Sequence, residues 1–449
     1  MKKILVLGAG KSATSLIEYL VKHADSNDWF ITVGDLDVQL ASRKIGGPHP
    51  RAKAIFFDVN DDSLRSSCVA EADIVASVLP ADFHFLVALD CLAHGKHLIT
   101  PSYISARERA LDEDFKARGL LFMGEIGLDP GIDHLSIMKT LADIKAQNGQ
   151  LTALRSFCGA LIAPESDTNP WHYKFTWAPM NVVLAGQGTA QYLADGKLQY
   201  VPYNRLFEQI DRYEVAGYGA FDGYANRDSL AYIDHYGISG IPTFMRGTLR
   251  RGGYCAAWNT LVKLGMTDNN LLVQRANQYS YADFLASFLP TSHKNNGKSL
   301  RINTADFLHL SPDAEPLDKL AYLGLFDPNE PILLEKGTPA QVMCDLLTRK
   351  WQLSAGDKDM IVMLHQFDYA VQQKKMRLIS SMVLIGQDED HTAIAVTVGL
   401  PMAIMVKLVA NEQVNLTGVC LPLQESVYEP MLQELARNGI EFKESVTEI

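Results

Sequence analysis

The pattern of apolar and polar positions divides the chain into two parts. Up to residue 150, short runs rich in β-branched residues alternate with stretches whose apolar residues recur with helical spacing. The runs that predict strands are Ile4–Leu7, Phe30–Val33, Ala54–Phe57, Ile74–Leu79, His97–Thr100 and Leu120–Met123. Because strands and helices alternate with short joins, this part predicts a doubly wound parallel sheet, which is an α/β fold.

Beyond residue 150 this alternation stops. Ala153–Phe157 and Tyr173–Trp177 alternate as strands of a mixed sheet do, and helical repeats dominate from about 258 to 350. The polar run 292–298 predicts a loop. Later in the chain we expect strands over Met360–Leu364 and Met376–Ile385, a long apolar helix near Ala393–Val409 and a β-rich end over Val419–Leu423.

Composition limits the possible classes of protein. A chain of 449 residues is too long for one ordinary core, so we expect two or three domains. The net charge of −11 argues against general binding to nucleic acid or anionic membranes and leaves open only a local basic pocket. The six cysteines are scattered without a CxxC pair, which suggests neither a disulfide framework nor a metal site and favours a reducing compartment.

No apolar run approaches the roughly 18 residues of a membrane span, and the apolar stretch at residues 4–7 is too short for a signal peptide. We therefore expect a soluble cytoplasmic protein.

The turn after the first strand has the spacing of a dinucleotide-binding loop, Gly8-Ala9-Gly10-Lys11-Ser12-Ala13. Gly8 permits a tight turn, Gly10 lets the backbone approach a pyrophosphate, and Ala13 permits close packing of helix on strand. Two glycines in a turn are common, but these stand between a strand and a helical repeat, which is the context that the motif requires. We therefore predict an N-terminal Rossmann domain whose cofactor loop includes Lys11 and Ser12.

The second strand ends in an acidic residue, Asp35. An acid about 20 residues after the glycines binds the ribose hydroxyls of adenosine in such domains. A carboxylate there would also repel a 2′-phosphate, so the sequence favours NAD over NADP. Asp58 and Val59 follow the third strand, where the adenine is expected.

The segment Gly124–His134 joins the last of these strands to a helical repeat. Asp129 stands where a helix N-cap belongs and Pro130 where the first helical residue belongs, so the simplest interpretation is a capped helix. Gly127 and Gly131 would let backbone pass close to another group. A carboxylate beside a helix N-terminus at the end of a strand also lies where open sheets bind ligands, and the helix would keep it ionised. His134 is expected on the face of that helix.

Arginines in the second part suggest binding of carboxylates. Arg227 follows Asn226, and Arg246, Arg250 and Arg251 lie within six residues. A planar guanidinium suits carboxylates, so several such residues indicate a substrate with more than one, whereas the alternative is surface ion pairs of little energetic value. For Cys158, a buried core position is favoured over a nucleophile, since no neighbour in sequence would lower its pKa.

Together these segments resemble the saccharopine reductase family, the glutamate-forming saccharopine dehydrogenases of lysine metabolism. The resemblance spans nearly the whole chain in order, and the motif Gly124–Leu135 is much rarer than a glycine-rich loop. The other segments that carry it are Ser102–Ser105, Ser156–Gly159, Ala163–Ser166, Tyr173–Trp177, Asn226–Ser229, Arg246–Arg250, Thr397–Pro401 and Thr417–Val419.

The resemblance implies an oxidoreductase that joins glutamate and 2-aminoadipate 6-semialdehyde as an imine and reduces it to saccharopine, or runs the reverse oxidation. It implies a Rossmann domain (1–124 plus about 393–449), a mixed α/β domain for substrate and dimerisation (125–257 plus about 353–392) and a small helical domain (258–352). A homodimer with a small amino-acid substrate is expected.

The resemblance also assigns site residues. The substrate contacts fall on Ser102, Tyr103, Asp129, Arg227, Thr248, Leu249 and Arg250. The cofactor contacts fall on Gly8–Ala13, Asp35, Asp58, Val59, Val78, Thr100, Pro101, Leu128, Asp129 and Pro130, with Ala178 a weaker match. Asp129 is the candidate acid/base, although its expected ionised state favours an orienting role, and Ser102 and Tyr103 would hold a carboxylate or relay a proton.

This chain departs from the family pattern at two places. The fungal enzymes resemble one another in a Cys-Arg-Thr where this chain has Gly34-Asp35-Leu36, so their NADP preference is not carried over. Ala178-Pro-Met stands where the family tends to have serines.

Two alternative functions stay open. One is an imine-reducing dehydrogenase of the carboxynorspermidine type, which would need more acidic pocket residues. The other is a non-catalytic NAD-binding regulator.

Overall fold

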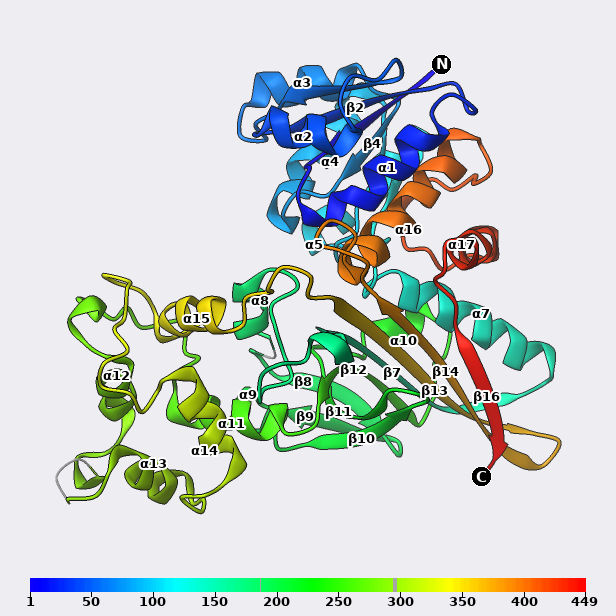
Figure 1. The fold of residues 1–449 in the computed structure, drawn as a ribbon. Helices are drawn as coiled ribbons and strands as arrows, with labels where there is room; N and C mark the ends of the chain where they lie inside the picture. The colour runs from blue at the N-terminus through cyan, green and yellow to red at the C-terminus, as the bar shows by residue number, and fades with distance from the viewer. Residues whose placement is uncertain (186, 294–296) are drawn as a thin grey trace. The chain divides into compact units, whose positions relative to one another are not determined.

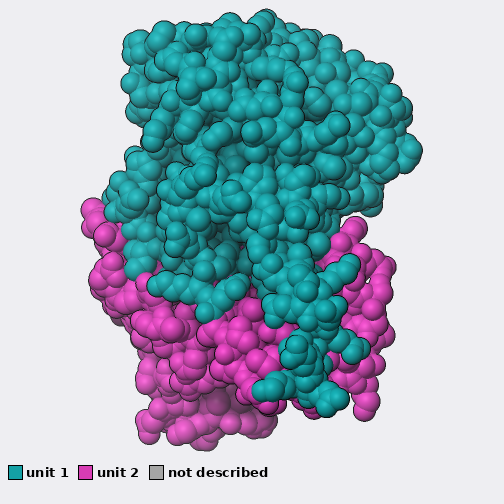
Figure 2. Space-filling view, turned by 90° about the vertical axis from the view of Figure 1, so that its right-hand side faces the viewer, with its two compact units in different colours: residues 1–150, 370–374, 382–444 teal, residues 151–369, 375–381, 445–449 magenta. Residues whose placement is uncertain are grey.

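The chain folds as two compact units (Figure 2), seen in a computed structural model that describes residues 1–185, 187–293 and 297–449. The first unit comprises Met1–Gln150, Ala370–Lys374 and Met382–Glu444. The second comprises Leu151–Tyr369, Lys375–Ser381 and Ser445–Ile449. Of the polar run predicted as a loop, residues 294–296 lie outside the described residues.

A seven-stranded parallel sheet forms the centre of the first unit (Figure 1), which confirms the predicted doubly wound fold. In spatial order its strands are β15 (Gly418–Cys420), β6 (Leu121–Met123), β5 (His97–Ile99), β4 (Ile74–Ser77), β1 (Lys2–Leu7), β2 (Trp29–Asp35) and β3 (Ala52–Phe56). The predicted β-rich end of the chain is thus an edge strand of this sheet. Apolar side chains such as Leu5, Val75 and Phe122 form its core, because these strands are covered on both faces.

Helices between the strands cover this sheet: α1 (Thr14–His23), α2 (Val38–Ile45), α3 (Asp62–Ala70), α4 (His84–His94), α5 (Ala106–Arg109), α6 (Asp112–Ala117) and α7 (Ile132–Ala146). Two more come from the end of the chain, α16 (Ala393–Ala410) and α17 (Glu425–Arg437). In Figure 1 the orange α16 lies beside the blue α1, and α17 packs on α7. The close approach at α1 needs a glycine, because a Cβ on Gly399 would lie 2.8 Å from the carbonyl oxygen of Ser12.

The expectation that no apolar run reaches the length of a membrane span is wrong. Helix α16 has 18 residues with a mean hydropathy of 2.1, so it is long and apolar enough to cross a membrane. Of this stretch, 78% is buried inside the protein, as in a core helix. Its apolar residues face neighbouring elements on all sides, which removes the polar face that a surface helix would show.

A mixed sheet lies mainly in the second unit, as predicted, while its residues 150, 370–371, 374, 382–385 and 443–444 belong to the first unit. Its order is β10 (Ile210–Val215), β11 (Gly219–Ala225), β12 (Thr243–Arg251), β7 (Gln150–Ile162), β13 (Asp359–Val371), β14 (Lys374–Ile385) and β16 (Lys443–Glu448). Beside this path, β8 (Ala190–Ala194) pairs with β12 and with β9 (Lys197–Val201). The β12–β7 pair is parallel and the β11–β12 pair antiparallel.

The run Tyr173–Trp177 is not a strand, contrary to prediction. Its apolar positions alternate because Tyr173 and Phe175 both pack on Trp351, with ring centroids 5.3 Å away in each case. The alternation therefore reflects an aromatic cluster.

Helices occupy the 258–350 region, as the helical repeats predict. They are α11 (Tyr254–Leu264), α12 (Tyr281–Phe288), α13 (Leu300–Leu308), α14 (Glu315–Leu323) and α15 (Pro339–Lys350), and short helices α8 (Pro179–Val183), α9 (Tyr203–Leu206) and α10 (Tyr232–His235) precede them. All of these lie within the second unit, and a separate helical domain stays a prediction.

Candidate cofactor and substrate sites

The dinucleotide loop has the predicted strand–turn–helix geometry. Gly8 follows β1 with φ +96°, and a Cβ there would lie 3.3 Å from the carbonyl oxygen of Val78. Gly10 has open space around it, and Lys11–Ala13 forms a 3₁₀ turn that leads into α1. The loop therefore leaves room for a ligand beside its backbone, as dinucleotide binding requires.

Asp35 is bonded to the glycine-rich loop itself. Its Oδ2 accepts a hydrogen bond of 2.7 Å from the amide of Ala9, and its Oδ1 accepts one of 2.9 Å from the amide of Asp37. Both donors are amides, which suits an ionised carboxylate. Asp35 therefore fastens the loop to the end of β2 and places a negative charge there. After β3, Asp58 accepts 2.9 Å from the amide of Asn60, and Val59 is buried.

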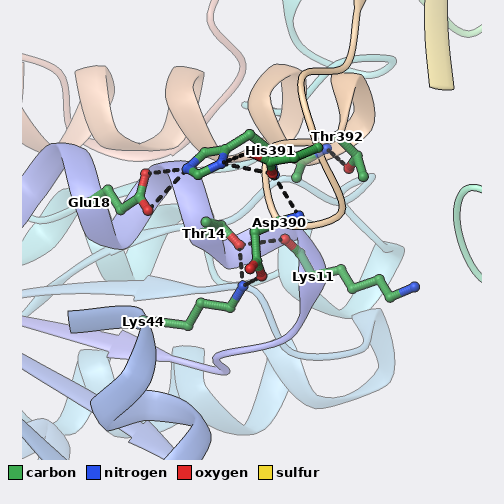
Figure 3. Close-up of polar contacts among 9 residues, drawn as sticks. Lys11, Thr14, Glu18, Lys44, Asp390, His391 and Thr392 are labelled. Carbon is green, nitrogen blue, oxygen red and sulfur yellow. Dashed lines mark hydrogen bonds and ion pairs between the residues drawn. The ribbon is translucent and has the colours of Figure 1, made fainter. Parts of the chain in front are cut away.

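A late segment of the chain is fastened to the start of α1 (Figure 3). The ammonium of Lys44 donates 2.7 Å to the hydroxyl of Thr14 and pairs with Asp390, while Thr14 donates 3.2 Å to the carbonyl of Lys11. His391 lies 2.9 Å from Glu18 Oε2 and 3.0 Å from Asp388 Oδ1.

These contacts affect the protonation of His391. Burial disfavours the charged imidazole, but the carboxylates of Asp388 and Glu18 outweigh this and raise the pKa of His391. We did not predict these contacts from the sequence. The charged run 388–391 before a long apolar helix was the available signal.

The turns after β4, β5 and β6 bring several predicted residues together. Thr100 is buried, and its amide donates 2.9 Å to the carbonyl of Met123. The hydroxyl of Tyr103 donates to Asp129 Oδ1 at 3.5 Å, the long end of the hydrogen-bond range. The two catalytic candidates Tyr103 and Asp129 are thus neighbours.

The prediction that Asp129 caps the following helix is wrong. Helix α7 begins at Ile132, its N-cap position is Gly131 with φ +144°, and the amide of Gly131 donates 2.6 Å to Asp133. A Cβ on Gly131 would clash with the carbonyl of Gly127, so the chain needs glycine at this close approach. The Asp129–Pro130 peptide bond, after the buried Leu128, is cis. Because α7 begins only at Ile132, Pro130 is not the first helical residue, and the helix-end argument for an ionised Asp129 no longer holds.

His134 lies on α7, as expected, but it is fully buried. Its Nε2 is 3.0 Å from Oε2 of Glu125, which is also buried. The other oxygen of Glu125 accepts 3.2 Å from the amide of Ile104. Glu125 thereby connects the loop that carries Tyr103 to α7, a role that local sequence did not reveal.

Arg250 is one of the buried cations of the second unit. Only 4% of it is exposed, and its guanidinium carbon lies 5.2 Å and 5.4 Å from the ring centroids of Tyr173 and Tyr254. Burial raises the pKa of both tyrosine hydroxyls, and it raises that of Tyr224 to about 12, so these rings carry no charge at neutral pH.

The guanidinium has few partners. Its Nη1 donates 3.0 Å to the carbonyl of Leu249, and in the described part of the chain Nε has no hydrogen-bond partner and the group has no ion pair. Asp222, opposite Arg250 in the β11–β12 register, accepts from the amide of Gly253 at 3.3 Å. A buried guanidinium without a counter-charge is the arrangement expected of a receptor for an anion.

The other predicted residues of the second unit are placed differently. Thr248 is on the Arg250 face of β12, while Leu249 points to the opposite face, where its side chain is fully buried. A contact of Leu249 with substrate is therefore limited to its backbone. Arg227 is exposed with φ +50°, and Ala178 is exposed before α8.

The other two arginines of β12 lie over aromatic rings different from those around Arg250. Arg246 lies over the ring of Tyr232 at 4.3 Å, and Arg251 points to the opposite face of β12, over Phe221 at 4.5 Å.

The prediction that Cys158 is a core residue is wrong, because Cys158 is only partly buried. It pairs in register with Thr248. Within the described ranges, no group of three or more His, Cys, Asp or Glu residues could hold a metal ion.

The parallel sheet and its glycine-rich loop define a dinucleotide-binding oxidoreductase fold. A family model described as the saccharopine dehydrogenase NADP binding domain matches residues 4–123, and one described as the saccharopine dehydrogenase C-terminal domain matches residues 127–440. The chain therefore belongs to the saccharopine dehydrogenase family of oxidoreductases, as the resemblance predicts.

Individual relatives agree with this assignment. The chain is 31% identical over 454 residues to saccharopine dehydrogenase (NADP(+), L-glutamate-forming) of Schizosaccharomyces pombe and 32% identical over 455 residues to that of Saccharomyces cerevisiae, covering 99% of each chain. The apo structure of the Saccharomyces cerevisiae saccharopine dehydrogenase (L-Glu forming) matches with a TM-score of 0.89 at 30% identity, over 100% of both chains. A homospermidine synthase of Legionella pneumophila shares the fold alone, with a TM-score of 0.56 and 11% identity over 100% of this chain and 91% of that one.

Proposed function

We propose that this protein interconverts saccharopine with L-glutamate and 2-aminoadipate 6-semialdehyde in lysine metabolism. In the oxidative direction, saccharopine, an oxidised nicotinamide cofactor and water give glutamate, the semialdehyde, the reduced cofactor and a proton. The observation that carries the proposal is the buried, unpaired guanidinium of Arg250, in a chain that matches glutamate-forming saccharopine dehydrogenases over its full length. Saccharopine has three carboxylates, so it supplies the missing counter-charge.

The substrate residues that we propose divide into carboxylate binders and proton-handling groups. Arg250 and Arg227 bind carboxylates, with Thr248 and the backbone of Leu249 beside them. Ser102, Tyr103 and Asp129 act at the secondary amine, where imine formation and hydrolysis require proton transfers. The hydroxyl of Tyr103, bonded to Asp129, provides a route for a proton between these two side chains.

The cofactor residues that we propose lie at the carboxyl ends of the parallel strands. They are the loop Gly8–Ala13, Asp35, Asp58, Val59, Val78, Thr100, Pro101 and Leu128–Pro130, with Ala178 the weakest member. When bound, the nicotinamide ring accepts or supplies the hydride. The chain's own contribution is a pre-shaped loop and buried strand ends that exclude water from the reacting atoms.

We further propose that the cofactor is NAD, although the fungal relatives are named for NADP(+). The support is the carboxylate of Asp35, whose two amide bonds keep it at the end of β2. A negative charge there repels a 2′-phosphate and accepts hydrogen bonds from ribose hydroxyls.

One assay tests the reaction. Purified protein is mixed with saccharopine and either NAD or NADP, and the absorbance of the reduced cofactor is followed. We expect turnover with saccharopine and none with carboxynorspermidine. Absence of turnover with either cofactor would contradict the proposed reaction and favour a non-catalytic dinucleotide-binding protein.

A substitution tests the cofactor. Asp35→Arg should shift the ratio of kcat/KM values toward NADP. Asp37→Asn, which alters the cap of α2 and an ion pair with Arg43, should leave the ratio unchanged. A clear NADP preference in the unaltered protein, or an unchanged ratio in Asp35→Arg, would contradict the role of Asp35 without affecting the proposed reaction.

We also propose a cytoplasmic homodimer. The support is the acidic composition, the scattered free cysteines and the family's expected dimerisation domain. Light scattering of the purified protein at micromolar concentration tests the oligomeric state, and a monomeric mass would contradict it.

A further inference from the structure

A buried histidine connects two strand ends of the first unit. His84 is the first residue of α4 and is only 1% exposed. Its Nδ1 lies 3.1 Å from the hydroxyl of Ser77, the last residue of β4, and its Nε2 lies 3.0 Å from the hydroxyl of Ser102, in the turn after β5. Neither His84 nor Ser77 is among the residues that the sequence motifs single out.

The imidazole in this position is neutral at physiological pH. Burial disfavours the charged imidazole and lowers the pKa of His84 to about 4. A neutral imidazole has one nitrogen that donates and one that accepts. The two serine hydroxyls are therefore coupled, because the nitrogen that accepts from one serine requires the other nitrogen to donate.

The fully buried Ser77 and the partly exposed Ser102 occupy different environments. If Ser77 donates to Nδ1, then Nε2–H donates to the oxygen of Ser102. The hydroxyl hydrogen of Ser102 is then directed away from His84 and can bond an acceptor in the site. The opposite tautomer would direct that hydrogen back to Nε2 and leave Ser102 as an acceptor only.

We propose that His84 is a positioning residue in the Nε2–H tautomer, which holds the Ser102 hydroxyl as a donor toward a carboxylate oxygen of the substrate. The inference rests on the proposed function through the role of Ser102. It adds a residue that orients the substrate without touching it. No net proton is transferred along Ser77, His84 and Ser102.

Two amide substitutions test the two ring nitrogens of His84 separately. His84→Gln places an amide where Nε2 was and keeps a donor near Ser102, whereas His84→Asn reaches only toward Ser77. We expect His84→Asn to lower kcat/KM for saccharopine about tenfold, mainly through KM, and His84→Gln to lower it by less than about threefold. The KM for the cofactor should change by less than about twofold in both variants. Equal losses in the two variants, or losses that follow their melting temperatures, would contradict the proposal.

A double-mutant cycle tests whether His84 acts through Ser102. In the Ser102→Ala background, His84→Asn should cause no further loss, because the coupled hydroxyl is absent. Losses that add fully would show that His84 acts elsewhere. If Ser102→Ala retains full kcat/KM while the unaltered protein turns over saccharopine, the positioning role is wrong and the proposed reaction stands.

The tautomer gives a readout that needs no turnover. Nitrogen NMR of the ¹⁵N-histidine-labelled protein, with the His84 signal assigned by its loss in His84→Gln, should show a protonated Nε2 and a bare Nδ1 from pH 6 to 8. The Ser77→Ala variant should increase exchange between tautomers. A protonated Nδ1 in the unaltered protein would overturn the inference. This outcome does not depend on whether the proposed reaction takes place.

Discussion

The two units differ in whether the polar groups at the proposed sites are hydrogen-bonded within the protein. In the first unit these groups are bonded to the protein itself: Asp35 to two amides, His84 to two serines, and Glu125 to His134. In the second unit, Arg250 is buried among aromatic rings with Nε unpartnered. A dinucleotide is bound largely by backbone amides, so side chains can be used to shape the loop. In the proposed function, the guanidinium itself binds a substrate carboxylate, so it would have to remain available.

Another buried cation of the second unit does have a counter-charge within the protein. In the same unit, the buried ammonium of Lys174 lies 2.6 Å from the carboxylate of Asp357. Among the described residues, the second unit thus pairs one buried cation within the protein and shows no counter-charge for another, which supports the proposal that Arg250 binds a ligand. Four predictions test this contrast.

The largest effect is expected at Arg250. Arg250→Met should lower kcat/KM for saccharopine about a thousandfold, because a charge-assisted, desolvated contact with carboxylate is lost. The same change should leave the free energy of unfolding unchanged or raise it by up to about 2 kcal/mol, because it removes an unpaired buried charge. Steady-state kinetics and urea denaturation measure both quantities.

Arg251→Met is the matched control for this experiment. Arg251 is the next residue on β12 but points to the opposite face, where it donates 2.7 Å to the carbonyl of Tyr218. Its kcat/KM should stay within about threefold of the unaltered value. A large loss of stability in Arg250→Met, with little loss of activity, would mean that the guanidinium is structural.

The second prediction concerns the paired cation. Asp357→Asn should destabilise the protein by about 3 kcal/mol, because it leaves the ammonium of Lys174 buried without its counter-charge. Asp318→Asn, which breaks an ion pair with Arg301 in which the carboxylate side chain is 64% exposed, should cost less than about 1 kcal/mol. Urea denaturation of both variants measures the difference, and equal costs would remove the contrast between paired and unpaired cations.

Sequence patterns predicted the parallel sheet, the glycine-rich loop and the mixed sheet because these depend on local periodicity and short spacing. The same reasoning failed where distant residues decide the outcome. Asp129 has the composition of a cap, but the approach of Gly131 to Gly127 starts the helix later. Tyr173–Trp177 alternates because of a ring from residue 351, far along the chain.

The buried polar pairs were equally inaccessible to sequence reasoning. Glu125 and His134 lie within a recognised motif, yet neither residue type indicates that the two side chains meet. His84 and Ser102 come together only because β4 and β5 are neighbours in the sheet. The family resemblance named Arg250, whereas its isolation from carboxylates is a property of the folded chain alone.

The third prediction concerns the segment that carries Asp129. Gly131→Ala should destabilise the protein by about 2 kcal/mol, since φ +144° is a glycine conformation and the added methyl meets the backbone of Gly127. Gly439→Ala, at φ +83° with no atom within 4 Å of the new methyl, should cost only about 1 kcal/mol. Thermal unfolding compares the two variants. If their costs are equal, the close approach at Gly127 is not needed for folding.

The smallest effect is a pH dependence at the contacts of Figure 3. The folded-state pKa of His391 is raised above its ordinary 6.5, because Asp388 and Glu18 outweigh the opposing effect of burial. The resulting stability is therefore fully present below pH 6.5 and is lost as the pH rises through the folded pKa. The neighbouring charges are Asp390 and Lys44, which pair with each other. Because these side chains are partly exposed, the contribution should be below about 1 kcal/mol and should shrink in high salt.

Melting temperatures from pH 6 to 9 for His391→Gln and the unaltered protein measure this contribution. The unaltered protein should lose more stability over that range than the variant does, because glutamine carries no charge to lose. His94→Gln is the control, since His94 lies 2.8 Å from the hydroxyl of Ser66 and has no carboxylate partner among the described residues. If His391→Gln and His94→Gln change the pH slope equally, the carboxylates around His391 do not stabilise its charge. The contacts of Figure 3 would then contribute less to stability than the hydrogen-bonded polar pairs elsewhere in the first unit indicate.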